Sequence, residues 1–291
     1  MTAVASAPAV VPGHGAGLLD VVRRRYLLQL LVRKELRVRY HGSVLGLAWS
    51  YVKPGVQYVV YFLALGVFLR LREVIPDFAV YLFSGMIVVN LFSEALGNAT
   101  RSVLNNADLV KKIYLPRELF PVASVWVAIV HFVPQLVVLL VGAVVAGWRP
   151  QVVPLLAAVA GFLVVLLLAT GLGLLCGAVN TVFRDLENLV DLLLMVAVWI
   201  SPVLYSWQQV AATPLVADNP VLLTIYQLNP VTVAVELFHW AFWLPGSGLG
   251  PEVLPPHLLW HTAWALGVAV LVLALGQAVF RRLEGRFAQE L

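Results

Sequence analysis

Long apolar stretches with almost no charged residues recur along this chain. They lie at about 54–69, 78–97, 119–147, 152–180, 189–207 and 258–280. A helix needs about 20 apolar residues to cross the hydrocarbon core of a bilayer. The chain is 61% hydrophobic and only 12% charged, so it lacks the polar surface that a water-soluble core of this size would need. None of the stretches alternates strictly, as barrel strands do. We therefore expect an all-α integral membrane protein with six transmembrane helices.

The basic residues indicate how these spans are oriented. With six spans and a cytosolic N-terminus, 16 of the 19 Lys and Arg residues lie inside, and only Arg70, Arg72 and Arg149 lie outside. A seventh span at 220–244 would change this distribution to 13 against 6. We therefore interpret 220–244 as short re-entrant helices that dip into the outer face between spans five and six. Both termini are then cytosolic, and 208–257 forms an outer gate region.

The N-terminal part of the chain differs in character from the spans. Residues 1–19 are rich in Ala, Val, Pro and Gly, which is typical of a flexible cytosolic tail. Residues 20–43 mix cationic and apolar residues, which predicts an amphipathic helix at the membrane interface; an ordinary solvated helix is the alternative. The residues expected to contact lipid phosphates at the membrane surface are Arg33, Lys34, Arg37 and Arg39. The six-span domain then covers 44–291.

Signatures of enzymatic sites are weak. No lysine follows a glycine, so the chain has no P-loop for ATP, and its single cysteine, Cys176, excludes a disulfide within the chain. Asp185, Glu187 and Asp191 could be misread as the metal site of a membrane prenyl- or glycosyltransferase, but ion pairing beside Arg184 explains them better. We expect no catalytic site, no metal site, no cofactor in this chain and no nucleic-acid binding.

A few polar and aromatic residues within the spans have two interpretations. His131, near Gln135, is either a hydrogen-bonded residue of the bundle or part of a transport pathway, and Glu94 lies near the inner end of span two. So few ionisable groups give little support to proton-driven transport. Aromatic residues could form an interface belt or a path on which sugar rings stack. The candidate path residues are Trp49, Tyr58, Tyr61, Phe62, Trp199 and Tyr205.

Several short motifs in order resemble the ABC-2 type permeases that export bacterial surface polysaccharides such as O-antigen, teichoic acid and lipid-linked galactan. They are Tyr40 to Trp49 followed by Pro54, LFSG at 82–85, Asn98 to Thr100, Leu104 to Glu118, Arg184-Asp185-Leu186, Ser201 to Tyr205, and Leu228-Asn229-Pro230 followed by Glu236. His239 departs from the pattern, because many of these permeases have a basic residue, often Arg, at this place.

The resemblance implies a homodimer of this chain in the bacterial inner membrane, bound to two copies of a separate ABC ATPase that carries ATP and Mg. The substrate would be a lipid-linked polysaccharide. The cytosolic loop at 100–116 would form the coupling helix, with residues 104, 105, 106, 108, 109, 111 and 112 (Leu104, Asn105, Asn106, Asp108, Leu109, Lys111 and Lys112), and the turn at Arg184 and Asp185 would be a second contact. The outer gate would include Asn229, Pro230, Glu236 and His239.

Two other functions stay open from the sequence. An ABC-2 permease for drugs or small lipids would use the same architecture with a narrower path. A polyprenyl-phosphate-dependent membrane transferase belongs to another class, and it would have activity without an ATPase partner.

Overall fold

Helices make up all the regular structure that we describe. The computed structural model describes residues 17–44, 46–112 and 115–290, and no strand occurs among them. The predicted all-α class is confirmed. Five helices are long and apolar enough to cross a membrane, and a bent helix pair is a sixth candidate. Most of the predicted tail at 1–19, namely 1–16, lies outside the described residues, as do Leu45, Ile113 and Tyr114 of the motifs. Ile113 and Tyr114 also belong to the predicted coupling loop at 100–116.

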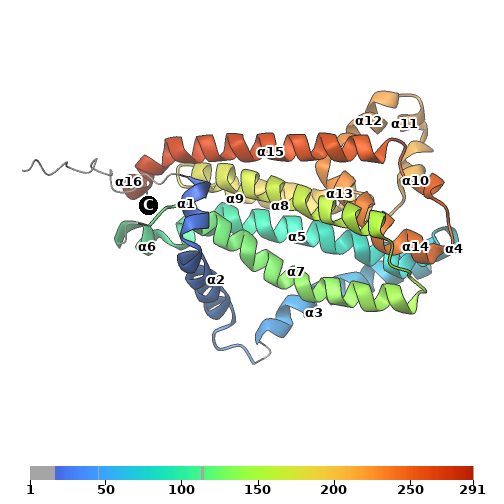
Figure 1. The fold of residues 1–291 in the computed structure, drawn as a ribbon, viewed down its shortest axis with the longest axis horizontal. Coiled ribbons are helices and arrows are strands. Elements are labelled where there is room, and N and C mark those ends of the chain that lie inside the picture. Colours follow the sequence, from blue (N-terminus) through green and yellow to red (C-terminus); the bar gives the residue numbers. More distant parts are fainter. Residues whose placement is uncertain (1–16, 45, 113–114, 291) are drawn as a thin grey trace, which may run out of the picture.

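Four long helices form the body of the bundle and run side by side along its long axis (Figure 1). They are α5 (Phe78–Asn105), α7 (Leu119–Val145), α8 (Val152–Asn180) and α15 (Leu258–Leu283). Of the candidate spans, α5 is the most buried: 72% of its most apolar window lies inside the protein. The other helices are arranged around this central one.

Small residues of α8 allow the central helices to pack closely. A Cβ atom at Gly171 would lie 2.6 Å from the backbone of Leu273 in α15, and one at Gly173 would lie 2.5 Å from Ala99 in α5. Lipid tails are as apolar as leucine, so helices in a membrane associate through such close van der Waals contacts rather than through the hydrophobic effect. Helix α8 therefore joins α5 to α15.

The first span is peripheral. It consists of α3 (Trp49–Tyr61), which contains Pro54, and the π-helix η2 (Phe62–Phe68), so the span begins at residue 49 rather than at the predicted 54. Only 6% of its most apolar window is buried. Most of the surface of this helix is therefore free to face lipid, substrate or another chain.

The predicted fifth span, 189–207, is shorter as a helix than the sequence suggested. Helix α9 (Leu186–Ile200) has 15 residues, a length of about 22 Å against a hydrocarbon core of about 30 Å. It ends before Pro202, because proline disfavours helical backbone in the residue before it and lacks an N–H for the helix. The chain continues through a turn to α10 (Trp207–Ala211), which lies at the opposite end of the bundle from the start of α9 (Figure 1).

The segment at 220–244 is a re-entrant helix pair, as predicted. Helix α12 (Pro220–Leu228) meets α13 (Pro230–Phe238) at a bend of 72°, and α13 continues through η3 (His239–Trp243) into α14 (Leu244–Ser247). Asn229 caps α13: its side-chain oxygen accepts a hydrogen bond from the Val231 N–H at 3.0 Å. Because α11 (Pro214–Ala217), α12 and α14 lie at the same end of the bundle in Figure 1, the chain enters and leaves on one side.

The N-terminal helices lie at the other end. Helix α1 (Leu18–Arg23) and helix α2 (Arg25–Tyr40) are separated at Arg24, and α2 buries Leu31 in a small core with Phe280 and Phe287. Helices α6 (Ala107–Lys112) and α16 (Phe287–Glu290) lie at this same end (Figure 1). We refer to it as the α6 end and to the opposite end as the α14 end.

Candidate functional site

Helix α6 presents an exposed ridge at the α6 end. The Asp108 side chain is 91% exposed and forms an i,i+4 ion pair with Lys112 at 3.9 Å. Asn105 and Lys111 are exposed too, whereas Leu104 and Leu109 are half-buried. Val110 is buried and anchors the helix in the core beneath it. Four of the seven predicted coupling residues of this loop, Asn105, Asp108, Lys111 and Lys112, are thus accessible.

Asn106 is different from its neighbours because it is buried. Its side-chain oxygen accepts a hydrogen bond from Lys34 Nζ at 2.6 Å, and its Nδ2 lies 3.2 Å from Glu35 Oε1 and 2.8 Å from the Ser102 carbonyl oxygen. These bonds join α2 to the junction between α5 and α6. In this conformation Asn106 therefore positions α6 and is not itself on the exposed ridge.

The turn between α8 and α9 lies at the same end of the bundle as α6 (Figure 1). The Asn180 side chain holds this turn against α5: its Nδ2 donates to the Thr100 carbonyl at 3.3 Å and its Oδ1 accepts from the Glu187 N–H at 3.2 Å. Arg184 and Asp185 are both exposed on the turn. The two predicted coupling segments are therefore accessible from the same end of the protein.

The neighbouring carboxylates pair with a cation that the sequence did not suggest. Glu187 lies 3.7 Å from Arg101 Nε, and Asp191 forms an ion pair with the same guanidinium group. Among the described residues, Arg184 has no carboxylate within 4.0 Å. The acidic residues of α9 are thus tied to α5, so the ion pairing that we predicted is present but Arg101 replaces Arg184 in it.

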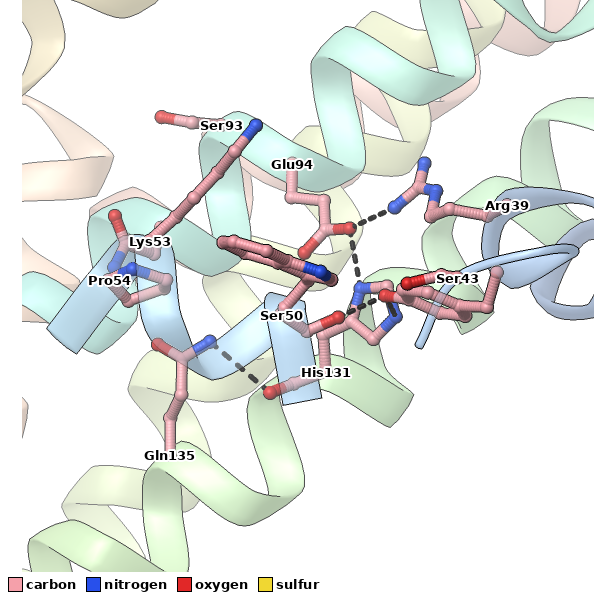
Figure 2. A pocket seen from close by; sticks show the side chains of 12 residues that line it. Arg39, Ser43, Ser50, Lys53, Pro54, Ser93, Glu94, His131 and Gln135 are labelled. Atoms are coloured by element: carbon pink, nitrogen blue, oxygen red, sulfur yellow. Dashed lines mark hydrogen bonds and ion pairs between the residues drawn. The ribbon is translucent and has the colours of Figure 1, made fainter. Parts of the chain in front are cut away.

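A polar cavity of about 710 Å³ opens between the α2–α3 connection, α3, α5 and α7 (Figure 2). Glu94 of α5 is its organising residue. The carboxylate Oε1 lies 2.6 Å from Arg39 Nη1 and 2.6 Å from His131 Nδ1, and Figure 2 shows both side chains directed toward it. The polar cavity therefore brings together ionisable groups from α2, α5 and α7.

His131 is fully hydrogen-bonded at the wall of this cavity. Its side chain is 2% exposed, and Nε2 lies 2.9 Å from the Tyr40 hydroxyl, which also contacts Ser50. In the neutral ring, Nδ1–H donates to Glu94 and Nε2 accepts from Tyr40. His131 is thus a hydrogen-bonded residue of the bundle, which is the first of its two interpretations, and it also lines the cavity. Its role in a transport pathway stays a prediction. The bond from Tyr40 also ties the last turn of α2 to α7.

The four basic residues predicted at the membrane surface divide into two pairs. Arg33 and Arg37 are exposed on α2. Lys34 and Arg39 are bonded within the protein, to Asn106 and Glu94 respectively. Sequence reasoning missed the bonds that Lys34 and Arg39 make, because their partners lie 72 and 55 positions away in the sequence and no local pattern links them.

The aromatic residues of the predicted path fall into two groups. In the first, Trp49 lines the polar cavity, Tyr58 packs edge-to-face on Phe83 with ring centroids 5.1 Å apart, and Phe62 stacks with Phe78. Tyr61 belongs to this group on α3 and its hydroxyl accepts a hydrogen bond from Gln57 at 3.2 Å.

The second group lies at the end of α9. Trp199 is 56% exposed, and its carbonyl accepts a hydrogen bond from the Tyr205 hydroxyl. Tyr81 of α5 lies between the groups: its ring stacks with Phe78 and its hydroxyl lies 3.0 Å from the Tyr205 carbonyl. The six candidate path residues thus form two groups that Tyr81 connects, and their role as a path stays a prediction.

Two of the four predicted gate residues, Glu236 and His239, are buried, whereas Asn229 and Pro230 are half-buried. His239 stacks on Tyr81 with ring centroids 3.9 Å apart, and its Nδ1 lies 3.7 Å from Glu236 Oε2. Glu236 and His239 are 4% and 0% exposed, and Asn229 and Pro230 form the α12–α13 turn. Several buried polar side-chain atoms between residues 201 and 239 have no hydrogen-bond partner among the described residues: Ser201 Oγ, Tyr226 OH, Gln227 Nε2, Thr232 Oγ1, Glu236 Oε1 and His239 Nδ1.

Comparison with known proteins agrees with this architecture. The family described as ABC-2 type transporter matches residues 26–243. An O-antigen export system permease protein RfbA from Klebsiella pneumoniae is 27% identical over 272 residues, covering 91% of this chain and 95% of that protein. The protein of the same name from Myxococcus xanthus is 32% identical over 215 residues, covering 72% of this chain and 81% of its own length. The region that the family model matches includes nearly all of α2, the polar cavity, α6 and the re-entrant helices. This chain therefore belongs to the ABC-2 type transporter family.

Proposed function

We propose that this chain is the membrane subunit of an exporter that moves a lipid-linked polysaccharide across the bacterial inner membrane, with energy from a separate ABC ATPase. The observation that carries this proposal is the exposed α6 ridge at the same end of the bundle as the α8–α9 turn, in a chain whose relatives are named as O-antigen export permeases. The chain has no P-loop, so ATP and Mg would bind to the partner. A homodimer with two ATPase copies would complete the transporter.

In this proposal the α6 end faces the cytosol. Most of the basic residues belong to segments at this end, whereas Arg70, Arg72 and Arg149 lie in connections at the other. Single cysteines introduced at Asp108 and at Glu252, in a Cys176→Ala background, test the orientation. The first should react with an impermeant maleimide only in inverted membranes, and the second only in intact cells; the reverse pattern would overturn the orientation.

The coupling step follows from how α6 is attached. Helix α6 continues α5 after a break at Asn106, and α5 is the most buried helix of the bundle. An ATPase that seats on α6 would therefore move α5 as a rigid element, and the rearrangement would open a path at the dimer axis. The exposed residues Asn105, Asp108 and Lys111 would form the docking contact, with Arg184 and Asp185 as the second contact.

Substitutions on the ridge test this proposal. The permease and its ATPase are reconstituted in proteoliposomes, and Asp108→Arg and Asn105→Trp are compared with Glu73→Arg, which changes an exposed carboxylate at the α14 end. We expect the first two to lower glycan export and substrate-stimulated ATP hydrolysis at least tenfold, and Glu73→Arg to leave both unchanged. If export persists in the ridge variants, α6 is not the coupling element.

A further inference from the structure

A small cavity lies inside the re-entrant helix pair, next to the start of α15. It has a volume of about 10 Å³ and is separate from the polar cavity, since no residue lines both. Tyr226 and Gln227 of α12 line it together with Thr232 and Glu236 of α13. The cavity therefore lies between the two helices that meet at the bend of 72°.

Each of these four residues has a buried polar atom that lacks a hydrogen-bond partner among the described residues. The atoms are Tyr226 OH, Gln227 Nε2, Thr232 Oγ1 and Glu236 Oε1. Thr232, Glu236 and Gln227 are only 2%, 4% and 9% exposed, so bulk solvent does not replace the missing partners. Most buried polar groups in folded proteins are hydrogen-bonded, because a polar group that leaves water without a new partner is destabilising. Four such atoms around one cavity indicate that the cavity binds a polar molecule.

We propose that this cavity is a binding site for one water molecule, which bridges α12 and α13 through the four side chains. A cavity needs about 10–15 Å³ to hold one water, and a buried water typically makes about three hydrogen bonds. The volume of about 10 Å³ therefore admits a single water and no larger ligand. This inference goes beyond the proposed function and does not depend on which substrate the chain transports.

The hydrogen-bonding capacity of the four atoms matches that of a water molecule. Gln227 Nε2 can only donate, a carboxylate oxygen such as Glu236 Oε1 can only accept, and the hydroxyl groups of Tyr226 and Thr232 can do either. A water can therefore accept from Gln227 and from one hydroxyl, and donate to Glu236 and to the other hydroxyl. All four buried atoms then have a partner.

A metal ion suits these atoms less well. Calcium takes six or more oxygen ligands, with carboxylates among them. Only three of the four atoms here are oxygens, two of these belong to hydroxyl groups, and the fourth atom is an amide nitrogen whose N–H groups repel a cation. Among the described residues, no group of three or more His, Cys, Asp and Glu residues could hold a metal ion.

The rest of the cavity wall offers no competing side-chain partner. Val233 of α13 and Leu258 of α15 are buried, and Trp207 and Pro255 complete the wall. The indole N–H of Trp207 already donates to the Val253 carbonyl at 2.8 Å. The polar side chains that the water can reach therefore all belong to α12 and α13.

The water would supply a side-chain link that these two helices otherwise lack. Among the described residues, no side-chain hydrogen bond joins α12 to α13 directly: Thr224 bonds within α12, and Asn229 bonds at the turn between the helices. A water that bridges two polar groups is enthalpically nearly as favourable as a direct hydrogen bond. The bend is therefore a hydrated joint, and α12 is attached to the bundle partly through solvent.

Radiolytic hydroxyl-radical footprinting of the full chain in nanodiscs tests the inference, because X-ray pulses form radicals from bound water as well as from bulk water. The reporter is Val233, which lines the cavity and is 1% exposed. The control is Val235, which is 0% exposed on the same helix but does not line the cavity. We expect oxidation of Val233 to be at least tenfold faster than that of Val235. Equal rates would overturn the site, whether both valines are protected by a dry interior or both are exposed by opening of α13.

A matched pair of variants tests the hydrogen bonds to the water. Thr232→Val keeps the shape of the side chain and removes one of the four polar groups. Its control is Thr224→Val on the exposed part of α12, where the threonine hydroxyl bonds to the Pro220 carbonyl at 3.1 Å. We expect Thr232→Val to lower the oxidation of Val233 at least threefold and Thr224→Val to leave it unchanged, with Val235 protected in both variants. Undiminished oxidation of Val233 in Thr232→Val would contradict the proposed site.

Discussion

Glu94 connects three helices through one carboxylate. It accepts hydrogen bonds from Arg39 of α2 and from His131 of α7, and both distances are 2.6 Å. The sequence singled out Glu94 and His131 because ionisable residues are rare within spans. Our assignment of Arg39 to the membrane surface stays a prediction. We did not predict its bond to Glu94, because the helical pattern of α2 shows which residues share a face but not which face meets the bundle.

Replacing Glu94 should loosen the end of α2. Glu94→Gln removes the negative charge from a contact that is part-exposed, so we expect a loss of about 1 kcal/mol in the attachment of α2. Amide hydrogen exchange of residues 33–40 should become several-fold faster. Glu73→Gln, which changes an exposed carboxylate that has no ion pair among the described residues, should leave this exchange unaltered. Identical exchange of 33–40 in Glu94→Gln and wild type would show that the carboxylate does not hold α2.

At the scale of elements, turn residues and charge distribution predicted much of the architecture, whereas helix ends were less predictable. The re-entrant pair followed from Asn229-Pro230 and from the positive-inside count, and the bend of 72° lies at that dipeptide. The short α9 could have been anticipated from Pro202, but the apolar run continues past it and concealed the break. The packing of α8 was not predictable, since glycines in a span do not indicate which helix approaches them.

The contact between α8 and α15 should depend on two glycines. A Cβ atom at Gly276 would lie 2.0 Å from the Gly171 carbonyl oxygen, so Gly276→Ala forces the helices apart. We expect a destabilisation of about 1–3 kcal/mol and a lower Tm for the purified protein. Gly267→Ala, on the same helix with open space around it, should not lower the Tm. Equal Tm values for the two alanine variants would contradict this description of the contact.

At the scale of the whole molecule, the two ends of the bundle differ in chemistry. The α6 end carries exposed charged residues on α2, α6 and the α8–α9 turn, whereas residues 208–257, which include the re-entrant pair, contain no Lys or Arg. The two sparsely buried segments, α3 with η2 and α9, leave apolar and aromatic surface available for a second copy of the chain. Our proposal explains both features: the chain is a passive conduit, and a separate ATPase drives it from the α6 end.

Reconstitution of the purified chain with and without its ATPase tests this account most directly. Vesicles containing a lipid-linked glycan are assayed for glycan that becomes accessible to an external glycosidase. We predict ATP-dependent transport only when both subunits are present, with no transport and no chemical turnover of the glycan lipid by this chain alone. Transport or turnover by the chain without the ATPase would contradict the account.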